Sequence, residues 1–396
     1  MPVLSKLPRR ALLAGLAAAP VAAVVAACSK DKPKPPPSSS STSSTTTTTT
    51  APPKPRPRAT GKGLPADLLA VMTAMYVGGK VPASGAVASA LAKRKPAGRS
   101  VTVGGSTGTW HKTPIAVVTR GKDVTLLVKG RAWSVVGGWW PSMGVSRPPF
   151  KAMHVLTIGS DARAAQAVEK CRGDSLHIIG IDAKGIGGIL GIPRDSWVPI
   201  ATGGTSKINS ALTFGGAVGQ WRTVRNTTGI PLDGYVITGF KGFRDLVSAV
   251  GGIALVYHGY LQNDKGMRIV RPGLNHLNRT TALAFARERH HLPNGDFGRS
   301  LNQGRLIQAG MAAAAKAGPG LLPRYLTRIW PHVSTNLGVE QILNACASVY
   351  LTPVAQVPNK VVPGGIGTRG GGQSVVLLGA AAQADFRDMR DGRLRA

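Results

Sequence analysis

Acidic residues are scarce in this chain of 396 residues, with only 17 Asp and Glu, so their positions are informative. One stretch of 35 residues holds five of them: Asp161, Glu169, Asp174, Asp182 and Asp195. Asp161 and Asp195 each follow an apolar run, Asp174 precedes one, and all three have an arginine within two residues. Such a set at strand ends is suited to holding Mg²⁺ together with phosphate oxygens. Turn formation beside Gly and Ser explains any one Asp alone, but the set favours a site.

Arginines form a second cluster further along the chain. Arg287 and Arg289 end a predicted helix, and Asp296 is expected to cap the next one. Arg299 and Gln303 then lie at positions i and i+4 on one face of that second helix. Free backbone N–H groups and a guanidinium at a helix start bind anions, and arginine suits bidentate recognition of phosphate. The alternative is that the first two arginines only complement a helix dipole.

The composition limits the classes of protein to be considered. Hydrophobic residues make up 43% of the chain, which excludes wholesale disorder, and only residues 11–27 are long, apolar and uncharged, which excludes a multi-span membrane protein. The chain has 49 Lys and Arg and a formal net charge of +32. A surface this basic favours polyanionic partners such as nucleic acid, anionic lipid or a phosphate-rich polymer.

The N-terminus indicates export. Residues 1–27 combine a basic start, with Lys6, Arg9 and Arg10, and a short apolar run, which is typical of a signal peptide. The run ends in VAAC, which resembles a bacterial lipobox and predicts Cys28 as the lipidated first residue of the mature chain. The alternative is an uncleaved signal anchor with an incidental cysteine, and adjacent Arg9 and Arg10 permit export by the twin-arginine route. Each places the protein outside the cytoplasm, on the outer face of the cell membrane, with a net charge of +29 once the leader is removed, so nucleic acid is not an expected partner.

Three further regions follow the leader. Residues 28–63 are rich in Pro, Ser and Thr and predict an extended linker. Residues 64–150 begin with helical spacing over Leu64–Lys95 and continue as short β-like runs separated by glycines, which predicts a small α+β accessory unit of unknown role. Residues 151–396 alternate apolar strands with helices, which predicts a three-layer α/β/α domain with a mostly buried central sheet.

The candidate elements of that last region are defined by apolar periodicity. The predicted strands are 154–158, 176–181, 189–192, 253–257 and 375–378, and the predicted helices are 218–228, 240–250, 280–289, 299–317 and 380–389. In such folds the polar site lies at the carboxyl ends of the strands.

At this point an ordered set of short motifs resembles a known family. The motifs are GSDAR at Asp161, RGDS at Asp174, IPRD at Asp195, KINSA at residues 207–211, ARERH at residues 286–290 and GDFGR at residues 295–299. Together they are similar to the LytR–CpsA–Psr family of cell-wall glycopolymer ligases over roughly residues 150–392. The resemblance implies a membrane-tethered, Mg²⁺-dependent phosphotransferase, with an accompanying pyrophosphatase activity. It moves a glycopolymer from a polyprenyl-pyrophosphate carrier to the 6-hydroxyl of N-acetylmuramic acid in peptidoglycan.

The resemblance also implies roles for single residues. It assigns Mg²⁺ binding to Asp161 and Asp174, and pyrophosphate binding to Arg172, Arg194, Arg287, Arg289, Arg299 and Gln303. A base would assist the attacking hydroxyl, and both Asp195 and Asp161 are candidates. The family often has another arginine three residues after GDFGR, where this chain has Asn302. It also has an apolar tunnel for the polyprenyl chain, for which Ala282, Leu283, Phe285 and Leu306 are candidate wall residues.

Remaining cysteines and histidines give weaker signals. Once Cys28 is lipidated, Cys171 and Cys346 form an even pair in an oxidising compartment, which predicts a disulfide; two free cysteines are the alternative. His290 and His291 lack a third ligand at metal spacing and are interpreted as surface or structural residues.

A function of a different class remains open. A lipid-anchored protein could bind anionic wall polymer or polyprenyl phosphate through the same arginines without turnover. The acidic pair Asp161 and Asp174 argues for the enzyme, because an anion binder gains nothing from carboxylates beside its ligand.

Overall fold

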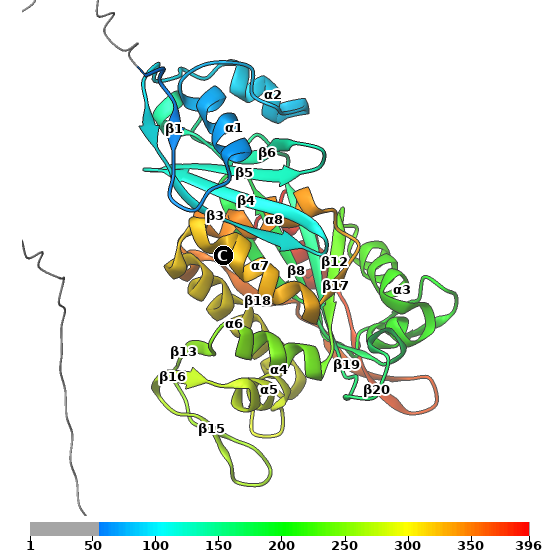
Figure 1. Ribbon diagram of the computed structural model, residues 1–396. Coiled ribbons are helices and arrows are strands. Elements are labelled where there is room, and N and C mark those ends of the chain that lie inside the picture. Colours follow the sequence, from blue (N-terminus) through cyan, green and yellow to red (C-terminus); the bar gives the residue numbers. More distant parts are fainter. Residues whose placement is uncertain (1–54, 396) are drawn as a thin grey trace, which may run out of the picture. The chain divides into compact units, whose positions relative to one another are not determined.

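The computed structural model describes residues 55–395, and the leader, most of the linker and Cys28 lie outside them. Within the described residues no helix combines the length and the apolar character needed to cross a membrane. The central feature is a six-stranded sheet with the order β17-β12-β7-β8-β9-β18 (Figure 1). Its strands are β7 (Met153–Ser160), β8 (Gly173–Asp182), β9 (Gly185–Gly191), β12 (Gly234–Thr238), β17 (Ser334–Thr335) and β18 (Asn359–Val361).

Strand direction is mixed in this sheet. β8 is antiparallel to both β7 and β9, whereas β12 is parallel to β7 and β18 is parallel to β9. The loop 161–172 therefore joins β7 to β8 at one end of the strands, and a short turn joins β8 to β9 at the other end. That loop and the residues after β9 form one polar edge of the sheet.

Helices cover both faces of the sheet, which confirms the predicted three-layer α/β/α architecture. On one face, Leu156 and Ile178 pack with α3 (Ala211–Thr228) and α9 (Ala380–Met389). On the other face, Val155 and Ile189 pack with α7 (Leu322–Ile329) and α8 (Val339–Ala347), beside α6 (Gly295–Ala317). Neighbouring residues of a strand point to opposite faces, so burial on both faces gives the near-continuous apolar runs of the sequence.

The remaining elements are shorter. Two of them are the helices α4 (Phe240–Ala249) and α5 (Arg279–Arg287). Four are two-stranded antiparallel pairs: β10 (Trp197–Pro199) with β11 (Thr205–Lys207), β13 (Ile253–Tyr257) with β16 (Gly273–Leu277), β14 (Leu261–Gln262) with β15 (Arg268–Val270), and β19 (Gly365–Arg369) with β20 (Gln373–Leu377). The β13–β16 and β14–β15 pairs share one buried cluster with α5 and α6, in which Phe285 and Leu306 take part.

The region before the sheet is α+β, as the sequence predicts. A four-stranded antiparallel sheet consists of β3 (Gly104–Trp110), β4 (Thr113–Arg120), β5 (Asp123–Lys129) and β6 (Trp133–Trp139), next to α1 (Ala66–Tyr76), α2 (Gly85–Ala92) and the pair β1 (Ala59–Thr60) and β2 (Val101–Thr102). The helical stretch 64–95 is two helices, because the segment 77–84 contains Gly78 and Gly79 at positive φ and Pro82.

One face of this four-stranded sheet packs on α1, and the other face packs on the α/β region. Val117 and Leu126 belong to the same buried cluster as Leu326 of α7 and Leu343 of α8. Thr327 of α7 accepts a hydrogen bond at 2.7 Å from the backbone N–H of Thr109. The four-stranded sheet thus backs the helices that line the cavity described below.

His177 connects β8 to the helix α6 through a buried hydrogen bond. Its Nε2–H donates to the carbonyl oxygen of Ser300 at 2.9 Å, and its ring is fully buried. Burial disfavours the imidazolium and lowers the pKa of His177 to about 4, although the Ser300 carbonyl acts in the opposite direction. The folded chain therefore holds this residue neutral at pH values where the unfolded chain protonates it.

We expect a pH dependence of stability from this residue. The free energy of unfolding falls as the pH drops from about 6.5 to about 4, and His177 accounts for about 3 kcal/mol of that loss. In His177→Gln, denaturant titrations at several pH values should show a loss that is smaller by this amount. The exposed His258→Gln serves as the control and keeps the wild-type slope; a His177→Gln slope equal to wild type would contradict the assignment.

Candidate active site

The antiparallel register of β8 brings the predicted acidic and basic motifs together. The end of β7 lies beside the start of β8, and the end of β9 lies beside the same segment. Residues that follow β7 and β9 therefore meet residues that begin β8. This places Asp161, Asp174 and Arg194 on the wall of one cavity.

Asp161 closes the loop between β7 and β8. Its backbone N–H donates to the carbonyl oxygen of Arg172 at 3.0 Å, and its Oδ1 accepts from the backbone N–H of Arg172 at 2.8 Å. The pairing of β7 with β8 ends at Ser160 opposite Gly173, next to these two hydrogen bonds. The second carboxylate oxygen of Asp161 receives no hydrogen bond from the described residues, and Asp161 lines the cavity.

Arg194 is the centre of a charge cluster. It makes an ion pair with Asp174 of β8, and its Nε lies 3.4 Å from Oδ1 of Asp296 on α6 and 3.7 Å from Oδ2 of its neighbour Asp195. Lys207 in turn pairs with Asp195 at 2.9 Å. The guanidinium side chain is only 18% exposed. Three carboxylates from three segments of the chain thus hold one largely buried arginine.

The amide of Asn209 completes the environment of Asp174. Its Nδ2 donates to Oδ1 of Asp174 at 2.9 Å, while its backbone N–H donates to the carbonyl oxygen of Arg194 at 3.2 Å. Both oxygens of Asp174 therefore have a donor. The motif KINSA carries Lys207 and Asn209, and its place in the ordered set of motifs was the signal for these two supporting residues.

Asp296 lies inside the site, which corrects its predicted role as a helix cap. The helix α6 starts at Gly295, its N-cap is Asn294, and Asp296 is the second residue of the first turn. Its Oδ1 lies 2.6 Å from Nη2 of Arg299, one turn further on, whose side chain is only 8% exposed. The acidic residue therefore bridges Arg299 and Arg194.

Two further arginines of the cavity, Arg287 and Arg289, lie at the end of α5 and just after it. A capping box on Asn278 begins the helix, with Oδ1 accepting from the backbone N–H groups of Thr280 and Thr281 at 2.8 and 3.0 Å. Arg287 is the last helical residue, and its guanidinium stacks over the ring of Phe240 at 4.8 Å from the centroid.

Gln303 joins this helix to α6. Its Nε2 donates to the carbonyl oxygen of Ala286 at 2.9 Å, in the last turn of α5. Arg287, Arg289, Arg299 and Gln303 all line the cavity. Four residues of the predicted phosphate-binding set are thus brought together where the end of α5 meets α6, and Arg172 and Arg194 join them from loops beside the sheet.

Burial and neighbouring charges act against each other in the charge cluster. Burial alone would lower the pKa of Arg194, but the carboxylates of Asp174, Asp296 and Asp195 outweigh it and raise that pKa. Burial raises the pKa of Asp296 despite the opposing charges of Arg299 and Arg194. Burial also lowers the pKa of Arg299, against the attraction of Asp296. The cluster contains costly buried charges that each depend on their partners.

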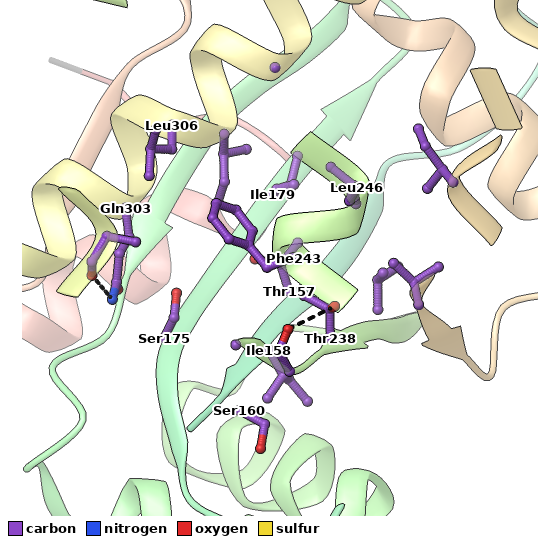
Figure 2. Close-up of a pocket in the computed structure, with 18 of the residues that line it drawn as sticks. Thr157, Ile158, Ser160, Ser175, Ile179, Thr238, Phe243, Leu246, Gln303 and Leu306 are labelled. Carbon is purple, nitrogen blue, oxygen red and sulfur yellow. Dashed lines mark hydrogen bonds between the residues drawn. The ribbon is translucent and has the colours of Figure 1, made fainter. Parts of the chain in front are cut away.

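One cavity of about 1100 Å³ begins at this cluster and continues between the sheet and the helices. Figure 2 shows Ser160, Ser175 and Gln303 toward one end and the apolar Ile179, Leu246 and Leu306 toward the other. The lining beyond them is apolar and includes Ile181, Ile186, Met311, Leu326, Ile342 and Val349. Asp174 and Ile181 lie on the same strand, so the cavity runs along β8 for roughly 23 Å at about 3.3 Å per residue.

Several predicted residues lie elsewhere. Asp195 does not line the cavity, and its carboxylate contacts Lys207 and Arg194. Asp182 lies at the opposite end of β8, where it pairs with Arg393. Of the candidate wall residues, Leu283 and Leu306 line the cavity, whereas Ala282 and Phe285 are fully buried in the neighbouring core. Leu283 lies on a different face of α5 from Ala282 and Phe285, so of these three only Leu283 reaches the cavity.

The predicted disulfide is wrong in this structure, where Cys171 and Cys346 are both free. Cys171 lies in the loop beside Asp161, at the polar end of the cavity. Cys346 is on α8, close to the turn between β8 and β9 at the apolar end, and burial raises the pKa of its thiol to about 11. The length of β8 separates the two cysteines, and sequence spacing carries no information on that separation.

The residues present fit a magnesium ion by the chemistry of their donors. Mg²⁺ takes hard oxygen ligands, commonly one or two carboxylates together with phosphate oxygens and water. Asp161 and Asp174 line one cavity, and Asp161 has a carboxylate oxygen without a hydrogen bond from the described residues. Asp174 is engaged by Arg194 and Asn209 and would share its oxygens between them and an ion.

Asn302 occupies the position where an arginine was expected from the resemblance. Its side chain is fully buried in α6, and its Oδ1 accepts a hydrogen bond at 2.7 Å from Nη1 of Arg305. Arg305 in turn lies over the ring of Tyr257 at 5.6 Å from the centroid. Neither residue lines the cavity, so this departure does not alter the arginines that do.

The α/β/α domain thus has clustered arginines and carboxylates at one end of a long, largely apolar cavity. The chain belongs to the LytR_cpsA_psr family, whose model matches residues 144–384, more than half of its length. The match includes every predicted cavity arginine and both predicted magnesium ligands.

Curated relatives are similar over part of their length. A Bacillus mycoides (strain KBAB4) protein named polyisoprenyl-teichoic acid–peptidoglycan teichoic acid transferase TagU is 34% identical over 195 residues, which are 48% of this chain and 62% of the relative. The corresponding TagV protein of Bacillus subtilis (strain 168) is 37% identical over 168 residues, 40% of this chain and 43% of the relative. The match therefore spans less than two thirds of these relatives.

Solved structures agree with the fold. The crystal structure of B. subtilis TagV is 27% identical, with a TM-score of 0.53, over 62% of this chain and 99% of that chain. The protein gbs0355 of Streptococcus agalactiae, at 22% identity and a TM-score of 0.53, shares the fold over 62% of this chain and 90% of its own.

The buried pair of Asp296 and Arg299 gives a test of the cluster. Arg299→Ala leaves a buried carboxylate with one partner fewer and should lower the free energy of unfolding by about 3 kcal/mol or more. Asp296→Ala leaves two arginines undercompensated and should also destabilise the fold. The double variant should lose less than the sum of the two, by about 1–3 kcal/mol in a denaturant-based double-mutant cycle. Additive losses would show that the two side chains do not interact.

Proposed function

We propose that this protein transfers a glycopolymer from a polyprenyl-pyrophosphate carrier to peptidoglycan, with the 6-hydroxyl of N-acetylmuramic acid as the acceptor. The observation that carries the proposal is a single cavity that runs along β8 for roughly 23 Å, with arginines and carboxylates at one end and an apolar wall beyond them. A polyprenyl pyrophosphate has the same two parts, a compact anion and a long apolar chain. The names of the curated relatives, which are polyisoprenyl-linked teichoic acid transferases, support the same class of donor.

The arginines account for binding of the anion. Pyrophosphate requires several donors, and Arg194, Arg287 and Arg299 face the cavity from three different segments. Guanidinium groups bind phosphate oxygens bidentately, and their contacts are stronger in a site with little water. Arg194 and Arg299 are positioned before the donor arrives by Asp174 and Asp296, so little reorganisation accompanies binding.

The transfer itself needs charge neutralisation and orientation. The acceptor hydroxyl attacks the phosphorus that carries the sugar, a phosphodiester forms, and the bond to the polyprenyl phosphate breaks. Asp161 and Asp174 would hold Mg²⁺, which when bound neutralises phosphate charge. The arginines stabilise the charge that develops on the departing polyprenyl phosphate.

A proton must also leave the attacking hydroxyl. Of the two candidate bases, Asp195 is engaged by Lys207 and does not line the cavity, so its role is to position Arg194. Asp161 lines the cavity with an oxygen free of hydrogen bonds from the described residues, and this oxygen would accept the proton only when it is not a ligand of Mg²⁺.

Anchoring outside the cell membrane by a lipid on Cys28 is part of the same proposal, since the donor is a membrane lipid. Cys28 lies outside the described residues. The basic composition, with 49 Lys and Arg against 17 Asp and Glu, suits a protein that works beside anionic lipid and wall polymer.

The transferase proposal predicts that acidic and basic residues fail differently. Asp161→Asn and Asp174→Asn should lower transfer by at least tenfold, with partial recovery at high Mg²⁺. Donor binding should change little in Asp161→Asn, whereas Asp174→Asn should also weaken it, because Asp174 positions Arg194. Arg287→Ala should weaken donor binding as well as transfer. The assay uses the full chain, a polyprenyl-pyrophosphoryl sugar and a peptidoglycan acceptor, with donor binding measured separately.

Matched controls lie on the same elements. Asp182→Asn changes a carboxylate at the far end of β8, and Arg279→Ala changes an arginine at the far end of α5, so both should transfer at the wild-type rate. Donor binding by every variant with no turnover by any form, including wild type, would instead support the non-catalytic binder. Wild-type transfer by both acidic variants after chelation would contradict the metal-assisted reaction.

A further inference from the structure

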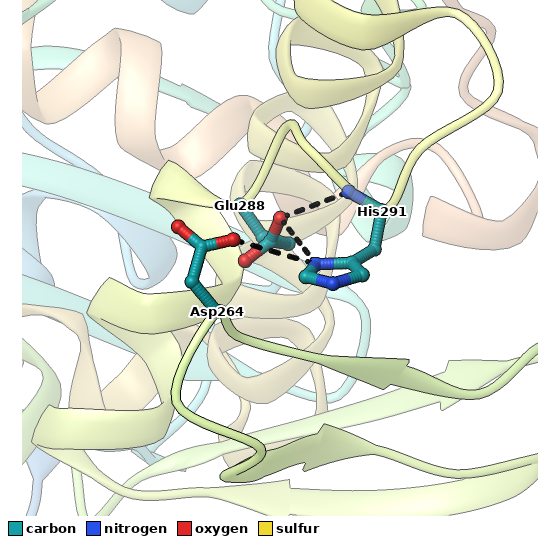
Figure 3. Close-up of side chains that lie close together, drawn as sticks. All are labelled: Asp264, Glu288 and His291. Atoms are coloured by element: carbon teal, nitrogen blue, oxygen red, sulfur yellow. Dashed lines mark hydrogen bonds and ion pairs between the residues drawn. The ribbon is translucent and has the colours of Figure 1, made fainter.

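A second group of side chains that could bind a metal ion lies outside the cavity, where the turn between β14 and β15 approaches the loop after α5. Asp264, Glu288 and His291 each offer one ligand atom, and these three atoms all lie within 4.8 Å of one another (Figure 3). The Nδ1 of His291 lies 3.2 Å from Oε1 of Glu288 and 3.9 Å from Oδ1 of Asp264. His290 lies beside this group, with its Nδ1 3.4 Å from the same Asp264 oxygen, but is not one of the three. His291, which lacks further ligands at metal spacing in the sequence, thus gains two carboxylates from the fold.

The distances suit a small tetrahedral ion. Zinc binds imidazole nitrogen and carboxylate oxygen at about 2.0–2.2 Å, so the edges of its coordination tetrahedron measure roughly 3.3–3.5 Å. The nitrogen of His291 lies 3.2 and 3.9 Å from the two carboxylate oxygens, and all three donor atoms lie within 4.8 Å of one another, so binding requires the side chains to move closer by about 1 Å or less. The mixed nitrogen and oxygen donors favour Zn²⁺ or a similar first-row ion over Mg²⁺ or Ca²⁺, which prefer oxygen alone.

The charge balance of the cluster points to a cation. The Glu288 side chain is only 7% exposed, and neither it nor Asp264 forms an ion pair with a lysine or arginine among the described residues. Its neighbours Arg287 and Arg289 line the cavity instead. In a chain with 49 Lys and Arg, this buried carboxylate thus has an imidazole and backbone N–H groups as its partners and no lysine or arginine among the described residues.

The carboxylate is also oriented as a ligand would be. Its Oε1 accepts hydrogen bonds from the backbone N–H groups of His290 and His291 at 2.9 and 3.2 Å, and its Oε2 receives none from the described residues. Hydrogen bonds of this kind orient metal-bound carboxylates in other proteins.

We propose that Glu288, His291 and Asp264, with His290 beside them, form a zinc-class site that ties the β14–β15 hairpin to the loop after α5. Asp264 belongs to the turn of that hairpin, between β14 and β15. Glu288 and His290 flank Arg289, so an ion there holds the backbone from which Arg289 reaches the cavity. Zinc binding itself is independent of the proposed transferase activity.

The test measures zinc affinity of the chelator-stripped full chain by competition with a chromogenic chelator, in excess Mg²⁺. One zinc should bind per chain, and zinc should raise the Tm and slow amide exchange at residues 263–267 and 288–292. His291→Ala and Asp264→Asn, which change exposed side chains, should each weaken binding at least tenfold, and His290→Ala/His291→Ala should abolish it. Glu288 itself is left unchanged, because its replacement could prevent folding.

Two controls separate this site from others. His258→Ala, an exposed histidine outside the cluster, and Asp161→Asn, in the cavity, should both keep wild-type zinc affinity and Tm shift. Loss of zinc binding in Asp161→Asn, unchanged binding in the double histidine variant, or no binding by wild type would each overturn the proposal. No donor lipid is present in these measurements, so a failed transfer assay leaves the result unaffected.

Discussion

The pairing of Arg194 with three carboxylates is the interaction on which the rest of the site depends. Asp174 comes from β8, Asp296 from α6, and Asp195 is the next residue in the loop after β9. A largely buried guanidinium without these partners would be very unfavourable. Each carboxylate also has a second partner, which is Asn209 for Asp174, Arg299 for Asp296 and Lys207 for Asp195. Formation of the cluster therefore requires that sheet edge, loop and helix be in register. The site and the fold are specified by the same contacts.

In the proposed function, the Arg194 cluster contributes more clearly to binding of the donor than to the stability of the fold. Buried ion pairs often add little net free energy, because desolvation opposes their attraction, and here burial raises the pKa of Asp296 in spite of two nearby arginines. What the cluster supplies is a set of positive groups whose positions are set in advance. The apolar cavity beyond it is backed by α7 and α8, which the N-terminal four-stranded sheet covers. The accessory region thus supports the wall of the cavity.

Local sequence signals predicted most of the fold and most of the site. Apolar periodicity gave the strands around Leu156, Ile178 and Ile189, because burial on both faces leaves a continuous run. Motif order brought Asp161, Arg194 and Arg299 into one hypothesis. Properties that depend on distance in space were not predictable: the bridging role of Asp296, the separation of the two cysteines along β8, and the approach of Asp264 to His291. Each of these depends on which elements pack together, and no local pattern encodes that.

The central claim is that one cavity holds both parts of a polyprenyl pyrophosphate, and its most direct test is a crystal structure of the chain with such a lipid bound. The account predicts density for the pyrophosphate between Arg194, Arg287 and Arg299, and density for the isoprenoid chain along Ile179 and Leu306 toward Ile181. A lipid bound elsewhere on the surface, or a chain that leaves the apolar cavity empty while the pyrophosphate is bound, would contradict it.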